Sequence, residues 1–475
     1  MKYPGFIGGA YTLRSKSLDA QRCVNLYLIA DEKGTGKDGN AGMLVSVPGK
    51  RLALNAGNDG VIRGLYTASN GEGFLVCFNK IYKLNSDKTT TDIGTIVTQS
   101  GLVSMADNGV QLMIVDGSYG YIYTFASGVF AQVTDPDMPQ ATQVRFLDGY
   151  FILNQANTGR FFITSLYDGF TIDTLDFATA EGSPDNIVAL ETLRKQLWIF
   201  GTQSVQVYFN SGDLDFPFAP INGVFIETGL ASTFSVVKVD QTIFWLGSNK
   251  DGQGVAYMAN GYQPQRISTN AIEFAIASYG DLSSVTAFGY QQEGATFIQF
   301  NFSATSWVYD LNSREWHERC AFSNGEFSRD KANTHMFFNG QHLVGDYASS
   351  KIYQYDLDYH YDGSDQRKWL RSAPHIASGL NYIFYSRFEV DMEFGVGNAI
   401  APGDDPQIIM RMSDDGANTW SNERYKSMGK IGQFNARAKF NNCGMSRDRV
   451  FEVSGTEPVK TVLLGASLEL KVGSK

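Results

Sequence analysis

The sequence predicts a mainly β protein, a β-propeller of six to seven blades with an appended C-terminal domain like a β-sandwich. Three observations support this prediction. Of the 475 residues, 49 are Gly, 33 Phe and 24 Tyr but only 19% are charged, which is typical of many short strands joined by tight turns. Short apolar runs recur between residues 60 and 360. Beyond residue 365 the spacing of the apolar runs becomes irregular.

The recurring apolar runs are the main evidence for blades. They follow one another at intervals of roughly 37 to 53 residues, the period of a four-stranded propeller blade. The runs are residues 74–78, 112–115, 150–153, 197–200, 243–246, 296–300 and 342–344. Seven runs predict seven blades, and the uneven spacing leaves six open.

A second set of strands follows many of these runs after a turn. Apolar residues alternate there with polar ones and with Tyr, which predicts half-buried antiparallel strands. These stretches are residues 79–84, 120–125, 204–209, 306–311 and 351–357. Residues 308–316 resemble a kelch-type strand, turn and Trp, in which Trp316 packs the blade. The alternative fold is a pair of β-sandwiches with meander connections.

The remaining elements define the expected domains. Alternating strands are predicted at residues 384–394, 407–412, 436–440, 449–453 and 463–470, and a short helix at residues 270–276. We expect residues 1–55 to form an N-terminal arm and first strand leading into the first blade. Residues 56–365 are then the propeller and residues 366–475 the C-terminal β domain. The polar loops at residues 31–41 and 362–367 are expected to contact neighbouring proteins.

One motif suggests an enzyme. Residues 413–420, SDDGANTW, resemble the Asp-box of sialidases and related propeller proteins. A sialidase of this type would need an arginine cluster, a Tyr nucleophile backed by Glu, and boxes in several blades, whereas one box is present here, beyond the propeller. We therefore expect Asp415 to accept hydrogen bonds from turn N–H groups while Trp420 packs beneath the turn.

The histidines and one acidic run raise the question of a metal. The five histidines fall in one stretch, which suggests a metal or acid/base site, but they lack metal-ligand spacing and strands separate them, so their side chains need not meet. They are His317, His335, His342, His360 and His375. Residues 356–365 carry Asp356, Asp358, Asp362 and Asp365 and resemble a calcium loop at its first two ligand positions. His360 stands at the third position and Gly363 comes two residues late, so a solvated turn is expected, with calcium as the open alternative.

Composition excludes several classes of function. The net charge of −10 leaves no broad basic surface for tight nucleic-acid binding, although an acidic wall would let DNA slide without sticking. The four cysteines lie far apart, and we expect reduced, buried thiols. No signal-peptide segment and no run of about 18 apolar residues is seen, which predicts cytoplasmic synthesis without a membrane span. No catalytic or phosphate-binding motif is present, so we assign no catalytic, cofactor-binding or metal-binding residue and expect no enzyme.

A family resemblance adds to this reading. Several stretches, in chain order, are similar to tail accessory proteins of short-tailed bacteriophages, also called packaged-DNA stabilisation, tail hub or nozzle proteins. These stretches are residues 22–27, 46–49, 74–84, 103–117, 205–218, 227–230 and 345–354. The resemblance implies a non-enzymatic virion protein without cofactors. Six copies would form a homohexameric ring below the portal and adaptor, extend the DNA channel, retain packaged DNA and anchor fibres, spikes or a needle.

Two other functions stay open from the sequence. A glycan-binding or glycosidase-like propeller is suggested by the Asp-box and by Trp198, Trp245 and Trp307, whose rings could stack on sugars, although burial in strands is the better expectation. A DNA-binding protein is disfavoured by the charge.

Overall fold

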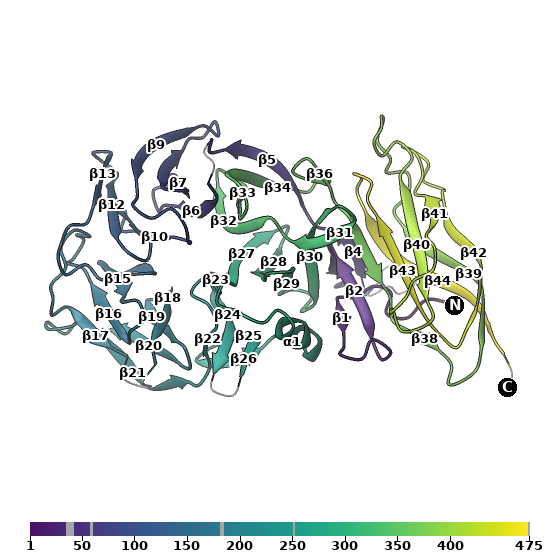
Figure 1. Cartoon of the computed structure of the whole chain (residues 1–475), viewed down its shortest axis with the longest axis horizontal. Helices are drawn as coiled ribbons and strands as arrows, with labels where there is room; N and C mark the ends of the chain where they lie inside the picture. Colours follow the sequence, from purple (N-terminus) through teal and green to yellow (C-terminus); the bar gives the residue numbers. More distant parts are fainter. Residues whose placement is uncertain (35–41, 58–59, 181–184, 250–251, 474–475) are drawn as a thin grey trace.

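The computed structural model describes residues 1–34, 42–57, 60–180, 185–249 and 252–473. Its strands form two bodies that lie side by side, a ring of blades and a two-layered sandwich (Figure 1). The predicted fold class, mainly β with a propeller and an appended β-sandwich, is therefore confirmed. The alternative of two sandwiches is wrong, because the strands between Ile62 and Asp356 form successive blades whose inner strands surround one axis.

The described strands form seven blades. Blade 1 contains β6 (Ile62–Thr67), β7 (Gly73–Cys77), β8 (Lys80–Leu84) and β9 (Thr90–Thr95). Blade 2 contains β10 (Ser104–Asp107), β11 (Gln111–Val115), β12 (Gly120–Thr124) and β13 (Val129–Gln132). Blade 3 contains β14 (Val144–Leu147), β15 (Tyr150–Asn154), β16 (Arg160–Ile163) and β17 (Phe177–Thr179). Blade 4 contains β18 (Ile187–Leu193), β19 (Gln196–Gly201), β20 (Val205–Asn210) and β21 (Phe218–Ile226).

The last three blades depart from the simple four-stranded order. Blade 5 contains β22 (Gly229–Leu230), β23 (Val236–Val239), β24 (Thr242–Asn249), β25 (Gly252–Asn260) and β26 (Gln263–Arg266). Blade 6 contains β27 (Thr286–Gln292), β28 (Ala295–Asn301), β29 (Ser306–Asp310) and β30 (Trp316–Ser323), and β31 (Glu326–Arg329) pairs with β30. Blade 7 contains β32 (Ala332–Phe338), β33 (Gln341–Asp346), β34 (Lys351–Asp356) and β5 (Gly49–Asn55), extended by β35 (Tyr361–Asp362) and β36 (Asp365–Gln366).

The ring closes between the last and first blades. The inner strands β6, β10, β14, β18, β23, β27 and β32 contact one another in this order, and β32 contacts β6. Strand β5, from the N-terminal segment, is antiparallel to β34, with Leu52 opposite Tyr353, so residues from both sides of the propeller segment build blade 7. Gly49 starts β5 where a Cβ atom would lie 1.7 Å from the Tyr359 carbonyl oxygen, so no larger residue fits. Each of the seven apolar runs lies in the strand that pairs directly with the inner strand of its blade, which is β24 in blade 5.

Apolar faces of neighbouring blades pack against each other. Between blades 1 and 2, Phe74 and Val76 of β7 pack in one cluster with Leu112 and Ile114 of β11, and all four are fully buried. Burial of one such side chain stabilises the fold by about 1.5–3 kcal/mol. Trp316, expected to pack its blade, is buried and donates its indole N–H to the Ile267 carbonyl oxygen at 2.9 Å, which confirms the expectation.

The sandwich consists of two sheets. One has the order β2 (Ala20–Val24), β37 (Trp369–Ser372), β43 (Asp448–Gly455), β40 (Gln407–Ser413) and β41 (Arg424–Ser427), with β1 (Tyr11–Thr12) beside β2 and β38 (Ile376–Ala377) beside β43. The other has the order β3 (Leu26–Ala30), β4 (Gly42–Ser46), β44 (Val462–Val472), β39 (Ile383–Met392) and β42 (Ala438–Ser446). Between them Phe388 stacks on Phe451, with ring centroids 4.6 Å apart.

The N-terminal segment enters both bodies. Strand β2 joins one sandwich sheet, β3 and β4 join the other, and β5 joins blade 7. The sequence suggested an arm leading into the first blade, whereas β5 pairs in the last blade and the earlier strands pair with C-terminal ones. Alternation of apolar residues identifies a strand but not its partner, and this accounts for the difference.

A continuous sheet joins the sandwich to the propeller. Strand β2 runs parallel to β30 of blade 6, with Val24 opposite Glu318, and antiparallel to β37. Asn25 follows β2 with a φ of 55° and is 2% exposed. Its Nδ2 donates to the carbonyl oxygens of Cys320 (2.9 Å) and Lys368 (2.7 Å), and its Oδ1 accepts from the Cys320 N–H (3.0 Å). One amide side chain therefore connects strands of both bodies.

A buried arginine organises the N-terminal loop at the same junction. Arg371 of β37 is fully buried and donates to the carbonyl oxygens of Phe6 (2.8 Å), Gly9 (2.8 Å) and Gly5 (2.8 Å). Arg22 of β2 makes a bidentate pair with Glu318 at 2.9 and 2.7 Å. The Arg371 contacts hold the N-terminal loop against β37, and the Arg22–Glu318 pair joins the sandwich to blade 6.

The helix and the cysteines agree with the sequence predictions. The helix α1 (Asn270–Ala277) starts after Thr269, whose hydroxyl accepts from the Ile272 N–H. Cys23, Cys77, Cys320 and Cys443 are buried free thiols, and burial raises the pKa of Cys23 and Cys320 to about 12. In the part of the chain that the structure describes, no helix has the length and apolar character needed to cross a bilayer.

Candidate interaction surfaces

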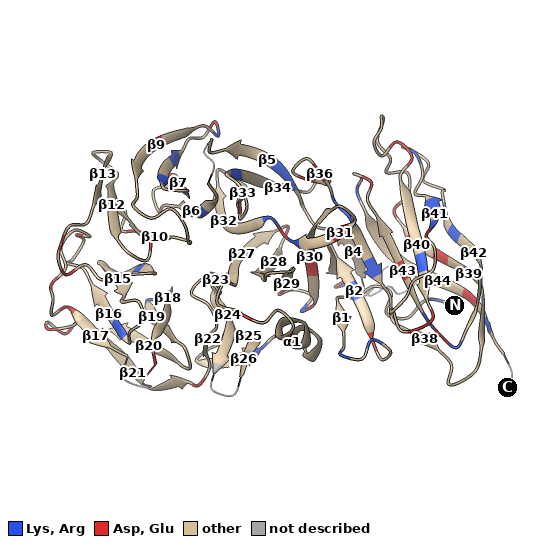
Figure 2. Cartoon of the chain, in the orientation of Figure 1, with Lys and Arg blue, Asp and Glu red and all other residues tan. Residues whose placement is uncertain are grey.

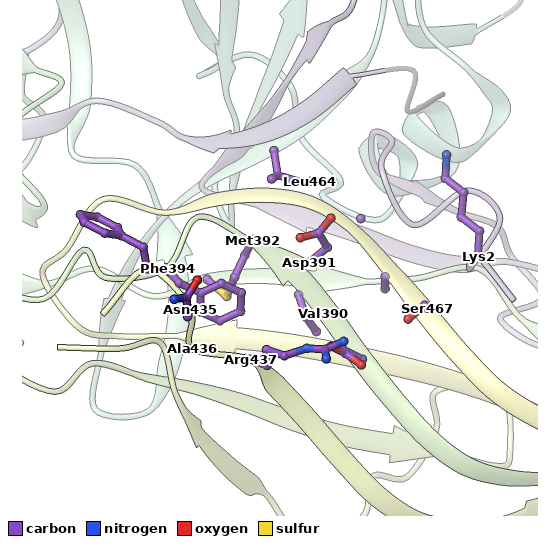
Figure 3. Close-up of a pocket in the computed structure, with 14 residues that line it drawn as sticks. Lys2, Val390, Asp391, Met392, Phe394, Asn435, Ala436, Arg437, Leu464 and Ser467 are labelled. Carbon is purple, nitrogen blue, oxygen red and sulfur yellow. The ribbon is translucent and has the colours of Figure 1, made fainter. Parts of the chain in front are cut away.

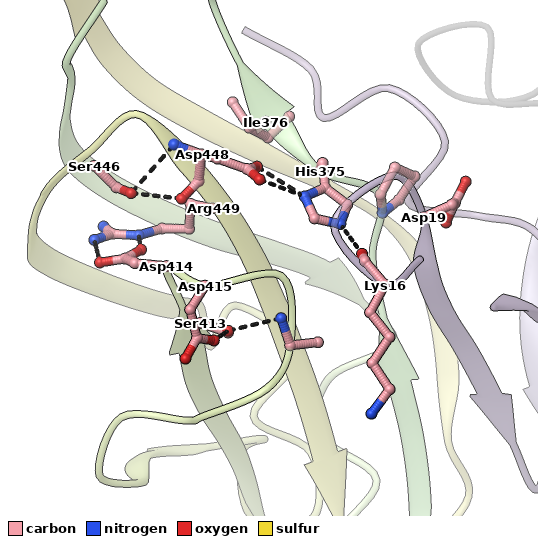
Figure 4. Close-up of polar contacts among 12 residues, drawn as sticks. Lys16, Asp19, His375, Ile376, Ser413, Asp414, Asp415, Ser446, Asp448 and Arg449 are labelled. Carbon is pink, nitrogen blue, oxygen red and sulfur yellow. Dashed lines mark hydrogen bonds and ion pairs between the residues drawn. The ribbon is translucent and has the colours of Figure 1, made fainter. Parts of the chain in front are cut away.

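The Asp-box forms a self-contained turn after β40 (Figure 4). The Asp415 carboxylate accepts from the Ser413 hydroxyl (2.7 Å), the Asn418 N–H (3.1 Å) and the Thr419 N–H (2.9 Å) and hydroxyl (2.6 Å). These hydrogen bonds hold the pKa of Asp415 well below its ordinary value. The Thr419 hydroxyl contributes most, and the Thr419 N–H and the Ser413 hydroxyl contribute next. The expected hydrogen bonds are confirmed. Trp420 is half-buried, and the Arg411 guanidinium lies over the Trp420 ring, 4.8 Å from the ring centroid.

The neighbouring Asp414 ties this turn to the sandwich. Its carboxylate accepts from Nε (2.6 Å) and Nη2 (2.7 Å) of Arg449, which is 4% exposed and lies over the Tyr385 ring at 4.6 Å. Gly416 packs against Ser17. A Cβ atom added at Gly416 would lie only 3.0 Å from the Cα atom of Ser17. The box therefore holds the β1–β2 connection against the sandwich, as a structural turn does.

His375 makes a second contact with the same connection (Figure 4). Its Nδ1 lies 2.8 Å from Oδ1 of Asp448, and its Nε2 lies 2.8 Å from the Lys16 carbonyl oxygen. Both ring nitrogens therefore lie within hydrogen-bond distance of an oxygen of another segment. The ring therefore links the N-terminal hairpin to β43.

The three Trp residues considered for sugar stacking are in the core. Trp198 is 1% exposed, Trp245 0% and Trp307 7%. Stacking on a sugar requires an exposed ring face, which none of the three offers. The expectation of burial is confirmed, and the stacking hypothesis based on these residues is wrong.

The five histidines do not form one site. His335 of β32 and His342 of β33 form a pair, with Nε2 of the first 3.0 Å from Nδ1 of the second. Burial lowers the pKa of His335 to about 3 and also lowers that of His342. His317 lies 2% exposed in β30, while His360 and His375 lie after β34 and β37. Sequence spacing did not identify the pair, because it depends on the register of a hairpin.

The carboxylates of residues 356–365 contact different cations. Asp356 pairs with Arg51 at 2.7 Å, and Asp365 pairs with Lys331 at 2.6 Å. Asp362 and Asp330, both 2% exposed, lie 3.0 and 2.8 Å from the buried Lys50 ammonium. Burial opposes the charge of Lys50, but the two carboxylates raise its pKa above the ordinary value.

These separate pairs do not converge as calcium ligands do. Among the described residues, no group of three or more His, Cys, Asp or Glu side chains is placed to hold a metal ion. Two polar loops are expected to contact neighbouring proteins. Residues 35–41 lie outside the described residues, so the expectation for the first loop stays a prediction. In the second, Asp362 and Arg367 are buried, and only residues 364–366 are exposed, so an exposed loop across 362–367 is wrong.

The propeller axis contains a cavity of about 660 Å³. Every blade contributes to its wall. The lining includes Leu65, Asp107, Arg145, Glu191, Val236, Ala287 and His335. Arg145 pairs with Glu191 at 3.0 Å, so charges on this wall are partly neutralised within the protein.

A second hollow, of about 700 Å³, lies on the outer face of the sandwich sheet that contains β39 and β44 (Figure 3). Arg437 donates from Nε to Oε1 of Glu389 at 2.6 Å on its floor. Phe394 and the 73% exposed Phe434 form an apolar end. The hollow is therefore a mixed polar and apolar surface.

Charge is distributed unevenly along the chain, whose charged residues are coloured in Figure 2. Residues 56–365 contain 16 Lys and Arg against 33 Asp and Glu, a net charge of −17. The remaining residues, 1–55 and 366–475, contain 23 Lys and Arg against 16 Asp and Glu, a net charge of +7. The segment that builds most of the propeller is strongly acidic, and the segments that build the sandwich and β5 are basic.

Together these features define a class: a seven-bladed propeller that shares one sheet with a β-sandwich built partly from the N-terminal segment. A family model described as Bacteriophage P22 Gp10, β-propeller, matches residues 4–360, and one described as Bacteriophage P22 Gp10, β-sandwich, matches residues 368–471. The chain therefore belongs to the P22 Gp10 family, and the resemblance to phage tail accessory proteins is confirmed.

One relative and two solved structures are similar to this chain. The tail hub protein gp10 of Salmonella phage P22 is 23% identical over 359 residues, 71% of this chain and 74% of that protein. Among solved structures, the extracellular domain of the putative hybrid two-component system BT4673 of B. thetaiotaomicron matches with a TM-score of 0.45 and 11% identity over 74% of this chain and 45% of its own. The WD40 propeller domain of Doa1 matches with a TM-score of 0.41 and 10% identity over 64% of this chain and 96% of its own. The fold described above rests on strand pairing and not on these scores.

Proposed function

We propose that this protein is a non-enzymatic structural component of a phage tail, and that its copies form a homohexameric ring below the portal and adaptor. The ring extends the DNA channel, retains packaged DNA and anchors fibres, spikes or a needle. One observation carries the proposal: the family match extends over both bodies of the chain, and the curated relative is a tail hub protein. The protein is then synthesised in the host cytoplasm and resides in the virion tail.

The physical properties of the chain support a structural role. Asn25 and the Arg22–Glu318 pair fix the sandwich to the propeller, so one copy is a rigid building block. The Asp415 carboxylate is satisfied by donors of its own turn, and the buried Lys50 forms ion pairs with Asp330 and Asp362, so both clusters have partners within the chain. The acidic propeller repels phosphates, so DNA would pass through the lumen without sequence-specific binding.

The division into residues 1–55, 56–365 and 366–475 remains a proposal about folding units. The first unit would be an exchangeable segment, because its strands β2 to β5 pair in sheets of the other two.

Depletion and complementation of the chain in its phage test this function. Virions assembled without it are expected to lose packaged DNA, and the wild-type chain supplied from a plasmid restores them. Electron microscopy of intact tails is expected to show six copies below the adaptor. Absence of the chain from purified virions, or full DNA retention without it, would refute the proposal. A different copy number would refute the hexamer alone.

A further inference from the structure

A buried lysine lies between two buried carboxylates where the N-terminal strand β5 joins blade 7. The Nζ atom of Lys50 lies 2.8 Å from Oδ1 of Asp330 and 3.0 Å from Oδ1 of Asp362. The Lys50 side chain is 7% exposed, and the side chains of Asp330 and Asp362 are each 2% exposed. The three groups come from β5, the β31–β32 connection and β35. The fold therefore brings one amine and two carboxyl groups into contact away from water.

The backbone holds Lys50 and Asp362 side by side. They are register partners in the parallel pairing of β5 with β35, and the Gly363 N–H donates to the Lys50 carbonyl oxygen at 2.9 Å. Arg367 donates from Nη1 to the Val47 carbonyl oxygen at 2.5 Å, so the chain after β35 is anchored to the chain before β5. Groups held in contact in this way can react at an effective concentration of about 10⁵–10⁸ M.

The two carboxyl groups have different surroundings. Oδ1 of Asp330 also accepts from the Ala332 N–H at 2.9 Å. Burial opposes the ionisation of Asp330, but Lys50, this N–H and the Arg319 guanidinium lower its pKa below the ordinary value. Neither oxygen of Asp362 accepts a hydrogen bond of ordinary geometry from the described residues. Asp330 is thus held as a carboxylate that can accept a proton, and Asp362 loses no N–H donor when one of its C–O bonds breaks.

We propose that Lys50 and Asp362 form an intramolecular isopeptide bond, with Asp330 as the proton relay. One proton passes from the Lys50 ammonium to Asp362, and the neutral Nζ atom attacks the Cγ atom of Asp362. Asp330 takes a second proton from Nζ and passes it to the leaving oxygen. The N–C bond forms, one C–O bond breaks, and water departs with two of the three ammonium protons, while the third stays on the amide nitrogen. The step consumes no oxidant, reductant or cofactor.

Burial favours the amide over the ion pair. Two buried charges of opposite sign are replaced by one neutral amide, which removes their desolvation cost. The remaining Asp330 carboxylate keeps the Ala332 N–H and the charge of Arg319, and the new amide N–H is a further donor. The bond closes a covalent loop from residue 50 to residue 362, so β5 cannot leave blade 7 while the bond is intact. It forms within one copy and does not depend on the proposed ring.

Mass spectrometry of the full chain tests the bond directly. The denatured wild type is expected to be lighter than its sequence by one water molecule. Trypsin is expected to leave the bond after Lys50 uncut and to release residues 38–51 joined to residues 352–367. An ion pair alone leaves the mass of the sequence and two separate peptides, and that result overturns the proposal. A link from Lys50 to residues 330–331 would overturn the roles assigned to the two carboxyl groups.

Three variants test the individual roles. Lys50→Arg keeps the cation but removes the amine, so its mass should equal that of its sequence. Asp330→Asn keeps both bonding partners, and the bonded fraction after equal expression times should correspond to a rate at least roughly tenfold lower. Bonding of Asp330→Asn at the wild-type rate would overturn the relay.

Lys331→Arg is the matched control, because the Lys331 ammonium lies 2.6 Å from the exposed Asp365 and takes no part in the reaction. It should lose one water molecule as the wild type does, and absence of the loss would overturn the assignment to Lys50. Circular dichroism melts establish that each variant is folded. Should Lys50→Arg fail to fold, the joined peptide of the wild type decides the question.

Discussion

The junction at Asn25 offers a direct test of how the propeller and sandwich are coupled. Asn25→Ala removes three hydrogen bonds and leaves the Cys320 N–H and the carbonyl oxygens of Cys320 and Lys368 without this side chain. A buried group left unpaired costs about 1–3 kcal/mol, and an Ala at positive φ adds about 1 kcal/mol. With partial relaxation, we expect the free energy of unfolding to fall by roughly 3–6 kcal/mol, a large share of the 5–15 kcal/mol typical of folded proteins.

Two further variants separate the contributions. Asn25→Gly loses the same hydrogen bonds but accepts a φ of 55° without strain, so it should be more stable than Asn25→Ala by about 1 kcal/mol. Asn25→Asp keeps an acceptor for the Cys320 N–H but directs a carboxylate at two carbonyl oxygens, so it should be at least as destabilising as Asn25→Gly.

Calorimetry and tryptophan fluorescence of the full chain measure the effect. We expect the wild type to unfold with the sandwich and blade 6 coupled, because they share one sheet. In Asn25→Ala the fluorescence of Trp369, next to the junction, should change at a lower temperature than that of the propeller core. A loss of less than about 1 kcal/mol, with one unchanged transition, would show that Asn25 does not couple the two bodies.

The other predictions concern separate parts of the chain. Because the folded pKa of Asp415 is depressed, its stabilisation is present above the unfolded pKa and lost as pH falls through the folded value; Asp415→Ala should therefore reduce the acid dependence of the melting temperature, and an unchanged pH profile would contradict the role assigned to the Asp-box. His335, with its pKa lowered to about 3, makes stability fall as pH drops from about 6.5 toward 3, and urea midpoints of His335→Phe should show a weaker loss over that window. A fragment of residues 366–475 should lack stable structure by circular dichroism, since it lacks β2, β3 and β4, and a folded fragment would refute this. Cys23, whose pKa burial raises to about 12, should react with a thiol reagent only on unfolding.

The strands could be predicted because their burial is regular. The run at residues 112–115, for example, is β11, flanked on both sides within its blade, and a continuous apolar run is what such a position requires. The inner strands gave weaker signals, because one of their ends lines the axial cavity. Strand β6 contains Arg63 and Gly64, and β10 ends at Asp107. Residues of this kind break the apolar pattern without breaking the strand.

The junction could not be predicted, because its information lies between distant segments. Asn25 is one polar residue between the apolar pairs Cys23-Val24 and Leu26-Tyr27, and a turn would explain it equally well. Its bonds to Cys320 and Lys368 span about 300 residues of sequence, beyond any local pattern. The internal bonds of the Asp-box were predictable for the opposite reason, since Asp415 and its donors lie within seven residues.

The shared sheet also bears on the proposed ring. A ring of identical copies closes with one geometry only if the propeller and the sandwich of each copy keep a fixed relation, since variation in that relation changes the rotation between neighbours. This relation depends on the coupling of β30 to β2. Loosening that coupling at Asn25 should therefore broaden the distribution of oligomer sizes, which native mass spectrometry would measure.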